Sequence, residues 1–179
     1  MTRRAFPVAP DLAEEAPAAN GFWRGVDGAA FGLIYGAITA LGLLMAMGAH
    51  VENAFAMAAA LFGSVLAITL AKAFAEVVAK NLESGGDGPR ASFRSAWRHA
   101  RPTLVAANLP SLLLLAAGFG ALSPALAIAL SQGFGILLLL VVGGRVGWVV
   151  GRRARSAALG ALFTGGIGVA LAGMKYILH

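Results

Sequence analysis

Five apolar runs, each about twenty residues long, set the strongest limit on what this chain can fold into. An α-helix of that length rises about 30 Å, which matches the hydrocarbon core of a bilayer. Lipid offers no hydrogen bonds to the backbone, and the runs are too long and too unalternating for barrel strands. We therefore predict an all-α integral membrane protein, a five-transmembrane-helix bundle. Its predicted spans are about 28–48, 54–78, 103–122, 124–144 and 157–178.

The composition supports the same class of protein. Hydrophobic residues make up 59% of the 179 residues, charged residues make up 12%, and the mean hydropathy is +0.78. A soluble domain carries about 25% charged residues, so this chain has too few polar side chains to cover a water-facing surface. The sequence contains no cysteine, which excludes disulfides and thiolate metal sites.

The positions of the basic residues predict how the helices are oriented. Twelve of the fourteen Lys and Arg residues lie before the first run, between the second and third, or after the fourth. Only Lys175 falls on the opposite side, and Lys72 lies within the second run. Because Lys and Arg concentrate in cytoplasmic loops, we expect the N-terminus in the cytoplasm and the C-terminus outside, in the cell (inner) membrane. This placement also explains the net charge of +6 without a nucleic-acid partner.

Two polar segments lie outside the predicted spans. We predict that residues 1–20 form a disordered N-terminal tail and that residues 21–179 form a five-helix membrane domain. We predict that residues 89–101 form an amphipathic cytoplasmic helix, which lies on the bilayer and binds anionic lipid head groups. The alternative is that this helix binds a soluble partner. The residues expected to contact lipid are Arg90, Arg94, Arg98, Arg101 and Trp97.

Small residues recur at four-residue spacing in four of the five runs. Examples are Gly28, Gly32 and Gly36 in the first run, and Gly143 and Gly147 at the end of the fourth. This spacing lets helix backbones approach closely in a membrane, where no hydrophobic force pulls helices together. We interpret the stripes as contacts inside one bundle; a homodimer seam through one of them is the alternative.

Charged residues within the apolar runs are functional candidates, because each costs about 2.5–3.5 kcal/mol on insertion scales. Asp27 opens the first run, either as a cation ligand or as a carboxylate stabilised by the helix N-terminus. Lys72 and Glu76 lie one turn apart and can pair within their helix. Alternatively, Glu76 faces Asp27 across the bundle as a second carboxylate.

The third run contains an uncharged polar spot at Asn108 and Pro110. Proline removes one backbone hydrogen bond from a helix, and the amide of Asn108 can satisfy the carbonyl that is freed. We interpret this spot as structural. The sequence carries no hydrolase triad, HExxH motif, Walker loop or dinucleotide fingerprint, so we predict neither an enzyme nor a bound cofactor.

Part of this sequence resembles a known family. The stretch Gly25-Val26-Asp27-Gly28, opening a helix that continues GLIYGAITALG, resembles the first helix of the vacuolar iron transporter (VIT) family. The second run, ending AKAFAEVVAKNLE, and the close, GGRVGWVVGRRARSAALGALFTGGIGVALAG, are similar to its second, fourth and fifth helices. The resemblance covers roughly residues 22–178, in a short form without the cytosolic metal-binding domain.

This resemblance implies a function. Members of the family export divalent iron or manganese from the cytosol as dimers, in exchange for protons. By carry-over, Asp27 and Glu76 would be the metal ligands. The alternative hypothesis is a non-transporting membrane protein with a structural, assembly or lipid-interaction role.

Overall fold

The computed structural model describes residues 21–47, 53–84 and 89–178, without the side chains of residues 83–92 and 175–178. The described chain forms five helices: α1 (Gly21–Met47), α2 (Ala54–Ser84), α3 (Pro89–Gly118), α4 (Pro124–Gly151) and α5 (Ala154–Leu178). Each is long and apolar enough to cross a membrane, which confirms the predicted five-helix membrane architecture. The predicted tail at 1–20 lies outside the described residues, and the cytoplasmic orientation of the N-terminus stays a prediction.

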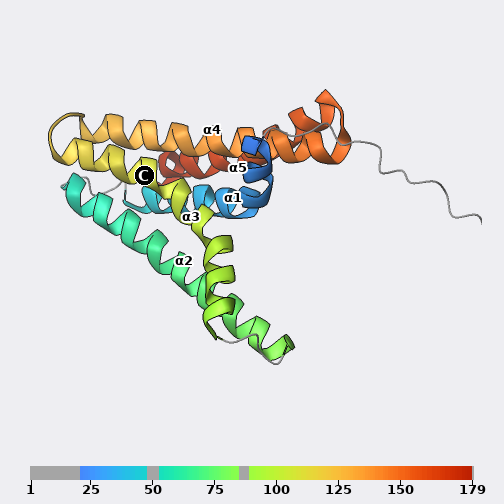
Figure 1. Ribbon diagram of the computed structural model, residues 1–179. Helices are drawn as coiled ribbons and strands as arrows, with labels where there is room; N and C mark the ends of the chain where they lie inside the picture. Colours follow the sequence, from blue (N-terminus) through green and yellow to red (C-terminus); the bar gives the residue numbers. More distant parts are fainter. Residues whose placement is uncertain (1–20, 48–52, 85–88, 179) are drawn as a thin grey trace, which may run out of the picture.

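Successive helices run in opposite directions, and the long bundle in Figure 1 shows this alternation. In that bundle α4 packs against α5 and α1, while α3 packs against α2 and α1. We call the end where α1, α3 and α5 begin the basic end. Its described arginines are Arg24, Arg94, Arg98, Arg101, Arg145, Arg152, Arg153 and Arg155.

Two clusters of buried side chains form the core of the bundle, and a third lies in the region where α2 and α3 leave it. The larger one joins α1, α2, α3 and α4 around Leu44, Leu61 and Leu114, none of which is exposed. The smaller one joins α1 to α4 through Leu41 and Leu139. Burial of these side chains excludes lipid from the centre of the bundle, where close packing supplies the attraction between helices.

Most of the small-residue stripes lie at helix contacts. A Cβ added to Gly36 of α1 would strike the backbone of α3 at Thr103. On α4, a Cβ added to Gly143 would strike Thr164 of α5, and one added to Gly147 would strike Ser156. These contacts agree with packing inside one bundle for the stripes of α1, α4 and α5. The stripe of α2 differs, because its five members are exposed: Ala59, Gly63, Ala67, Ala71 and Ala75.

The predicted surface helix at 89–101 and the third span form one helix, α3, that passes through Pro102. Proline removes a backbone hydrogen bond and its ring crowds the preceding turn, which bends a helix at that point. Figure 1 shows the bend, beyond which α3 leaves the bundle together with the end of α2. We call this hairpin, residues 73–84 and 89–101, the arm.

Alanines hold the two halves of the arm together. Ala73 of α2 and Ala96 and Ala100 of α3 are buried against one another, with Val77 and Trp97 packed beside them. Trp97 was predicted to face lipid, but it lies partly against α2 because the small alanines bring the two helices close. The arm is therefore a packed helix pair rather than a single helix lying on the bilayer.

Candidate functional site

Asp27 of α1 is bound by Arg145 of α4. The Arg145 Nε donates to Oδ1 of Asp27 and its Nη2 donates to Oδ2, both at 2.9 Å. The guanidinium also lies over the ring of Trp23, 5.0 Å from its centroid. Because α1 begins at Gly21, Asp27 is not in its first turn, and the alternative in which the helix N-terminus stabilises this carboxylate is wrong. Planar bidentate pairing of this kind fixes both side chains in one geometry.

Lys72 of α2 has partners on two other helices. Its Nζ donates to the hydroxyl of Thr103 on α3 at 3.2 Å. The same nitrogen lies 4.5 Å from the ring centroid of Phe31 and 4.3 Å from that of Tyr35, both on α1. The faces of aromatic rings attract cations, so this ammonium is stabilised without a salt bridge. The predicted pair with Glu76 is replaced by these contacts.

Glu76 is held within the arm. Its Oε1 lies 2.6 Å from the Nζ of Lys80 and 3.5 Å from the Nδ1 of His99 on α3. Lys80 also donates to the hydroxyl of Ser95 at 3.2 Å. Asp27 and Glu76 therefore engage different cations in different helix pairs. Among the described residues, no group of three or more His, Asp or Glu side chains could hold a metal ion.

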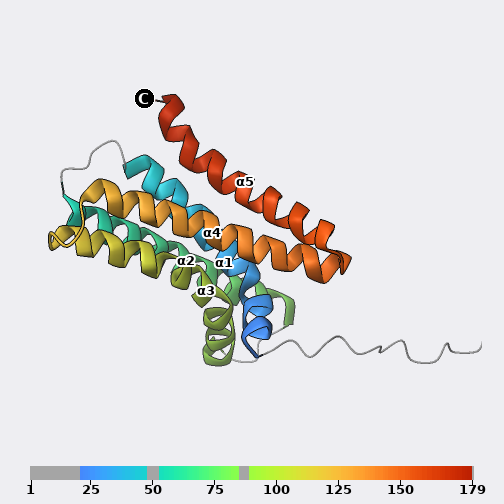
Figure 2. The same cartoon turned by 90° about the horizontal axis from the view of Figure 1, so that it is seen from above.

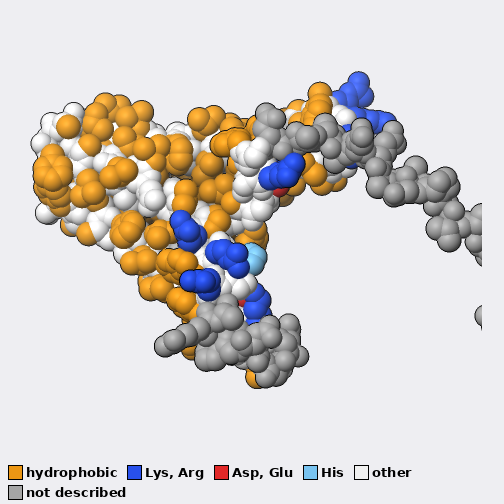
Figure 3. Space-filling view, in the orientation of Figure 1, with side chains coloured by type: hydrophobic (Ala, Val, Ile, Leu, Met, Phe, Trp, Pro, Cys, Tyr) orange, Lys and Arg blue, Asp and Glu red, His pale blue; other side chains and the backbone are white. Residues whose placement is uncertain are grey.

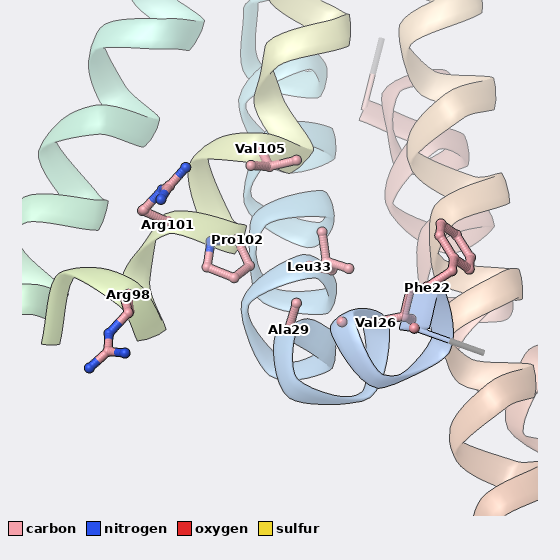
Figure 4. A pocket seen from close by; sticks show the side chains of 10 residues that line it. Phe22, Val26, Ala29, Leu33, Arg98, Arg101, Pro102 and Val105 are labelled. Atoms are coloured by element: carbon pink, nitrogen blue, oxygen red, sulfur yellow. The ribbon is translucent and has the colours of Figure 1, made fainter. Parts of the chain in front are cut away.

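A groove of about 520 Å³ separates the start of α1 from α3 at its bend. Its apolar side chains belong to Phe22, Val26, Ala29, Leu33, Pro102 and Val105, and its basic ones to Arg98 and Arg101. Figure 4 shows the apolar side chains along α1 and the bend, with both arginines on the α3 side. The groove thus combines an apolar wall with a basic rim. We call it the α1/α3 groove.

The rim belongs to a wider basic surface. Figure 3 shows Lys and Arg side chains gathered where the arm meets the bundle. Arg94, Arg98 and Arg101 are exposed and have no salt-bridge partner in the part of the chain that the structure describes. The predicted basic face is therefore present at these three positions, while the side chain of Arg90 lies outside the described residues. Phe93 stacks on Trp97 with centroids 6.3 Å apart and is 48% exposed.

Sequence reasoning missed the α1 wall of this groove. Phe22 and Val26 precede the predicted first span, and only the early start of α1 at Gly21 brings them beside α3. The aromatic pair Phe22-Trp23, placed where a helix meets the membrane surface, was the available indication. Likewise, no local sequence pattern could predict that Asp27 pairs with Arg145, which lies 118 positions away.

No protein-family profile matches the chain, and no curated protein or solved structure is significantly similar to it. The resemblance to the VIT family therefore stays a prediction. The class that the fold defines is a polytopic membrane protein with five helices able to span a bilayer.

Proposed function

We propose that this polytopic membrane protein binds an anionic phospholipid at its basic end. The head-group phosphate would bind at the basic rim, to Arg98 or Arg101, and an acyl chain would lie in the α1/α3 groove. The observation that carries this proposal is the coincidence of an apolar groove with two exposed arginines on its rim. It corresponds to the lipid-interaction role that the sequence left open as an alternative.

The chemistry of the groove supports an amphiphilic ligand. Guanidinium groups bind phosphate through paired hydrogen bonds, and Arg98 and Arg101 have no described carboxylate that competes for them. Apolar side chains such as Leu33 and Val105 favour a hydrocarbon chain over water. The volume of about 520 Å³ lies within the range of about 300–1,000 Å³ that small-molecule sites occupy.

The position of the groove supports a membrane lipid as the ligand. Arg98 and Arg101 lie in the last turn of α3 before Pro102, after which the residues of α3 are mostly apolar. That position is at head-group depth if the apolar part spans the hydrocarbon. Basic clusters at this depth attract anionic lipids by about 1 kcal/mol per Lys or Arg. With the basic end in the cytoplasm, as predicted, the groove would face the leaflet that carries most anionic lipid.

Divalent-cation transport, which the resemblance to the VIT family implies, has less support. Asp27 would have to release Arg145 before it could take a metal ion, and Glu76 would have to release Lys80. Uptake of Fe²⁺ or Mn²⁺ into proteoliposomes under a proton gradient, with Asp27→Ala as the control, tests that hypothesis separately.

Native mass spectrometry of the purified chain tests lipid binding directly. We expect phosphatidylglycerol adducts to exceed phosphatidylcholine adducts in the wild type. The double variant Arg98→Gln/Arg101→Gln should lose about tenfold in phosphatidylglycerol binding. The matched control Arg153→Gln/Arg155→Gln removes the same charge from two exposed positions, one just before α5 and one in its first turn. It should change binding less than twofold.

A second variant tests the apolar half of the site. Ala29→Phe fills the groove without changing charge, so it should reduce phosphatidylglycerol adducts while the protein keeps its helix content. If both double arginine variants lost phosphatidylglycerol binding equally, the lipid would be attracted by the general positive charge rather than bound at a site. That result, or equal binding of both lipids by the wild type, would overturn the proposal.

A further inference from the structure

Asn108 places an amide on the outer surface of α3, within the part of the helix that crosses the membrane. It is exposed, and its side chain forms no hydrogen bond with any residue that the structure describes. It lies six residues beyond Pro102, roughly 9 Å along the helix. A bilayer that covers the predicted span at 103–122 would place it within the hydrocarbon. An amide without a partner is costly in that environment. The predicted bond from Asn108 to the carbonyl that Pro110 frees, that of Ala106, is absent among the described residues. Ser131 donates to a different acceptor, the carbonyl of Pro110 itself, at 3.4 Å.

A second polar group lies beside Asn108. The hydroxyl of Ser111 is buried, with the residue 4% exposed, and has no hydrogen-bond partner among the described residues. Both residues line a groove of about 500 Å³ between α2 and α3, which we call the α2/α3 groove. Its remaining lining residues are Phe55, Ala58, Ala59, Phe62, Leu112 and Leu115. The α2/α3 groove is thus uncharged. Its lining combines small alanines, aromatic side chains and two polar groups that have no hydrogen-bond partner among the described residues.

A lipid tail would leave the Asn108 amide unsatisfied, because hydrocarbon neither donates nor accepts a hydrogen bond. A carboxamide carries a donor and an acceptor, so a second identical carboxamide is complementary to it. A two-fold contact between copies brings each residue near its own equivalent. Polar side chains that bond across helices in this way stabilise association in membranes.

We propose that two copies of this chain associate through the α2/α3 groove, with their Asn108 amides hydrogen-bonded across the two-fold axis. The proposal is independent of lipid binding at the basic end. The glycine stripes of α1 and α4 are not available for a homodimer seam, because Gly36 faces α3 and Gly143 and Gly147 face α5 of the same chain. The small-residue stripe of α2 is exposed, and its member Ala59 lines the α2/α3 groove.

Disulfide crosslinking in liposomes tests this interface, because the native chain has no cysteine. Leu112→Cys lies on the proposed interface and is 59% exposed; Leu137→Cys on α4 is the control, with 57% exposure. At high lipid-to-protein ratio, mild oxidation should crosslink Leu112→Cys at least fivefold more than Leu137→Cys. Equal crosslinking at both positions would overturn the proposal.

The role of the amide is tested in the Leu112→Cys background. Asn108→Leu should lower crosslinking at least fivefold, whereas Asn108→Gln, which keeps the amide, should retain most of it. Single-molecule photobleaching of the labelled wild-type chain should show two steps in most liposomes that contain protein. One-step bleaching in nearly all liposomes would contradict a dimer. A monomer that purifies with a small molecule bound at Asn108 would contradict it as well.

Discussion

The carboxylate of Asp27 on α1 and the guanidinium of Arg145 on α4 form two parallel hydrogen bonds of 2.9 Å each. Arg145 is the more covered partner, with 18% of its side chain exposed against 39% for Asp27. Trp23, one turn before Asp27 on α1, covers the guanidinium from one side. The pair therefore joins the first and fourth helices at the basic end, beyond the apolar core clusters.

Breaking this pair should loosen the junction of α1 and α4. Asp27→Asn keeps the size of the side chain but leaves Arg145 without a counter-charge, so the melting temperature in detergent should fall by a few degrees. Arg155→Gln, an exposed arginine at the same end, should leave it unchanged. In the double variant Asp27→Asn/Arg145→Gln the loss should be smaller than the sum of the single losses. Additive losses would show that the two residues act separately.

Phe31 should matter to stability despite its exposure. Its ring is 72% exposed, close to the 73% of Phe163 on α5, but only Phe31 lies against the ammonium of Lys72. We expect Phe31→Leu to cost about 0.5–1 kcal/mol, and Phe163→Leu to be neutral within error. Thermal unfolding of both variants measures the difference. In a Lys72→Met background the effect of Phe31→Leu should disappear, and its persistence would assign it to packing alone.

The contact between α4 and α5 should not tolerate replacement of its glycines by larger residues. A Cβ at Gly160 would meet the backbone of Gly143 and Gly147, so Gly160→Leu should destabilise the fold by about 1–3 kcal/mol. Gly166 lies on the same helix with nothing within 4 Å of its added Cβ. Gly166→Leu is therefore the matched control and should retain the wild-type melting temperature. Similar melting temperatures for the two variants would refute the contact.

The arm should open when its alanine contact is overfilled. Ala96 is fully buried against α2, so Ala96→Leu should raise deuterium uptake in residues 93–101. Ala75→Leu adds the same side chain to an exposed position of α2 and should not change uptake. Because Arg98 and Arg101 line the α1/α3 groove from α3, the same variant should also weaken phosphatidylglycerol binding if lipid occupies that groove. Unchanged exchange in Ala96→Leu would show that the arm is held elsewhere.

The number and order of the helices were predictable because length and hydropathy alone decide whether a run can cross a bilayer. Their ends were not: α1 begins at Gly21 and α4 continues to Gly151, in segments whose polar residues hydropathy assigns to water. A helix continues past the hydrocarbon wherever neighbouring helices or water satisfy its backbone. That extension is what creates the α1 wall of the groove.

The partners of the charged residues were harder to predict. The four-residue spacing predicts an ion pair between Lys72 and Glu76. The Lys72 ammonium instead lies against aromatic rings of α1, which are about forty positions away in sequence. A local pattern cannot include such contacts, since they depend on how the helices are arranged around one another. The basic face of 94–101 was predicted because its spacing lies within one helix. The unsatisfied amide of Asn108 emerged only when the lipid-facing side of α3 was known.

The outer position of α5 has a consequence for how the protein is made. Both buried core clusters are built from α1 to α4, with Leu171 of α5 packed only at the edge of the smaller one. Only 11% of the apolar stretch of α5 is buried, against 33–44% for the other four, and Figure 2 shows its carboxyl end standing away from them. Since synthesis proceeds from the N-terminus, the four-helix core can assemble during translation before residue 154 emerges. The last helix would then pack against α4 after the other four helices have left the ribosome, so its docking is the final step in forming the bundle.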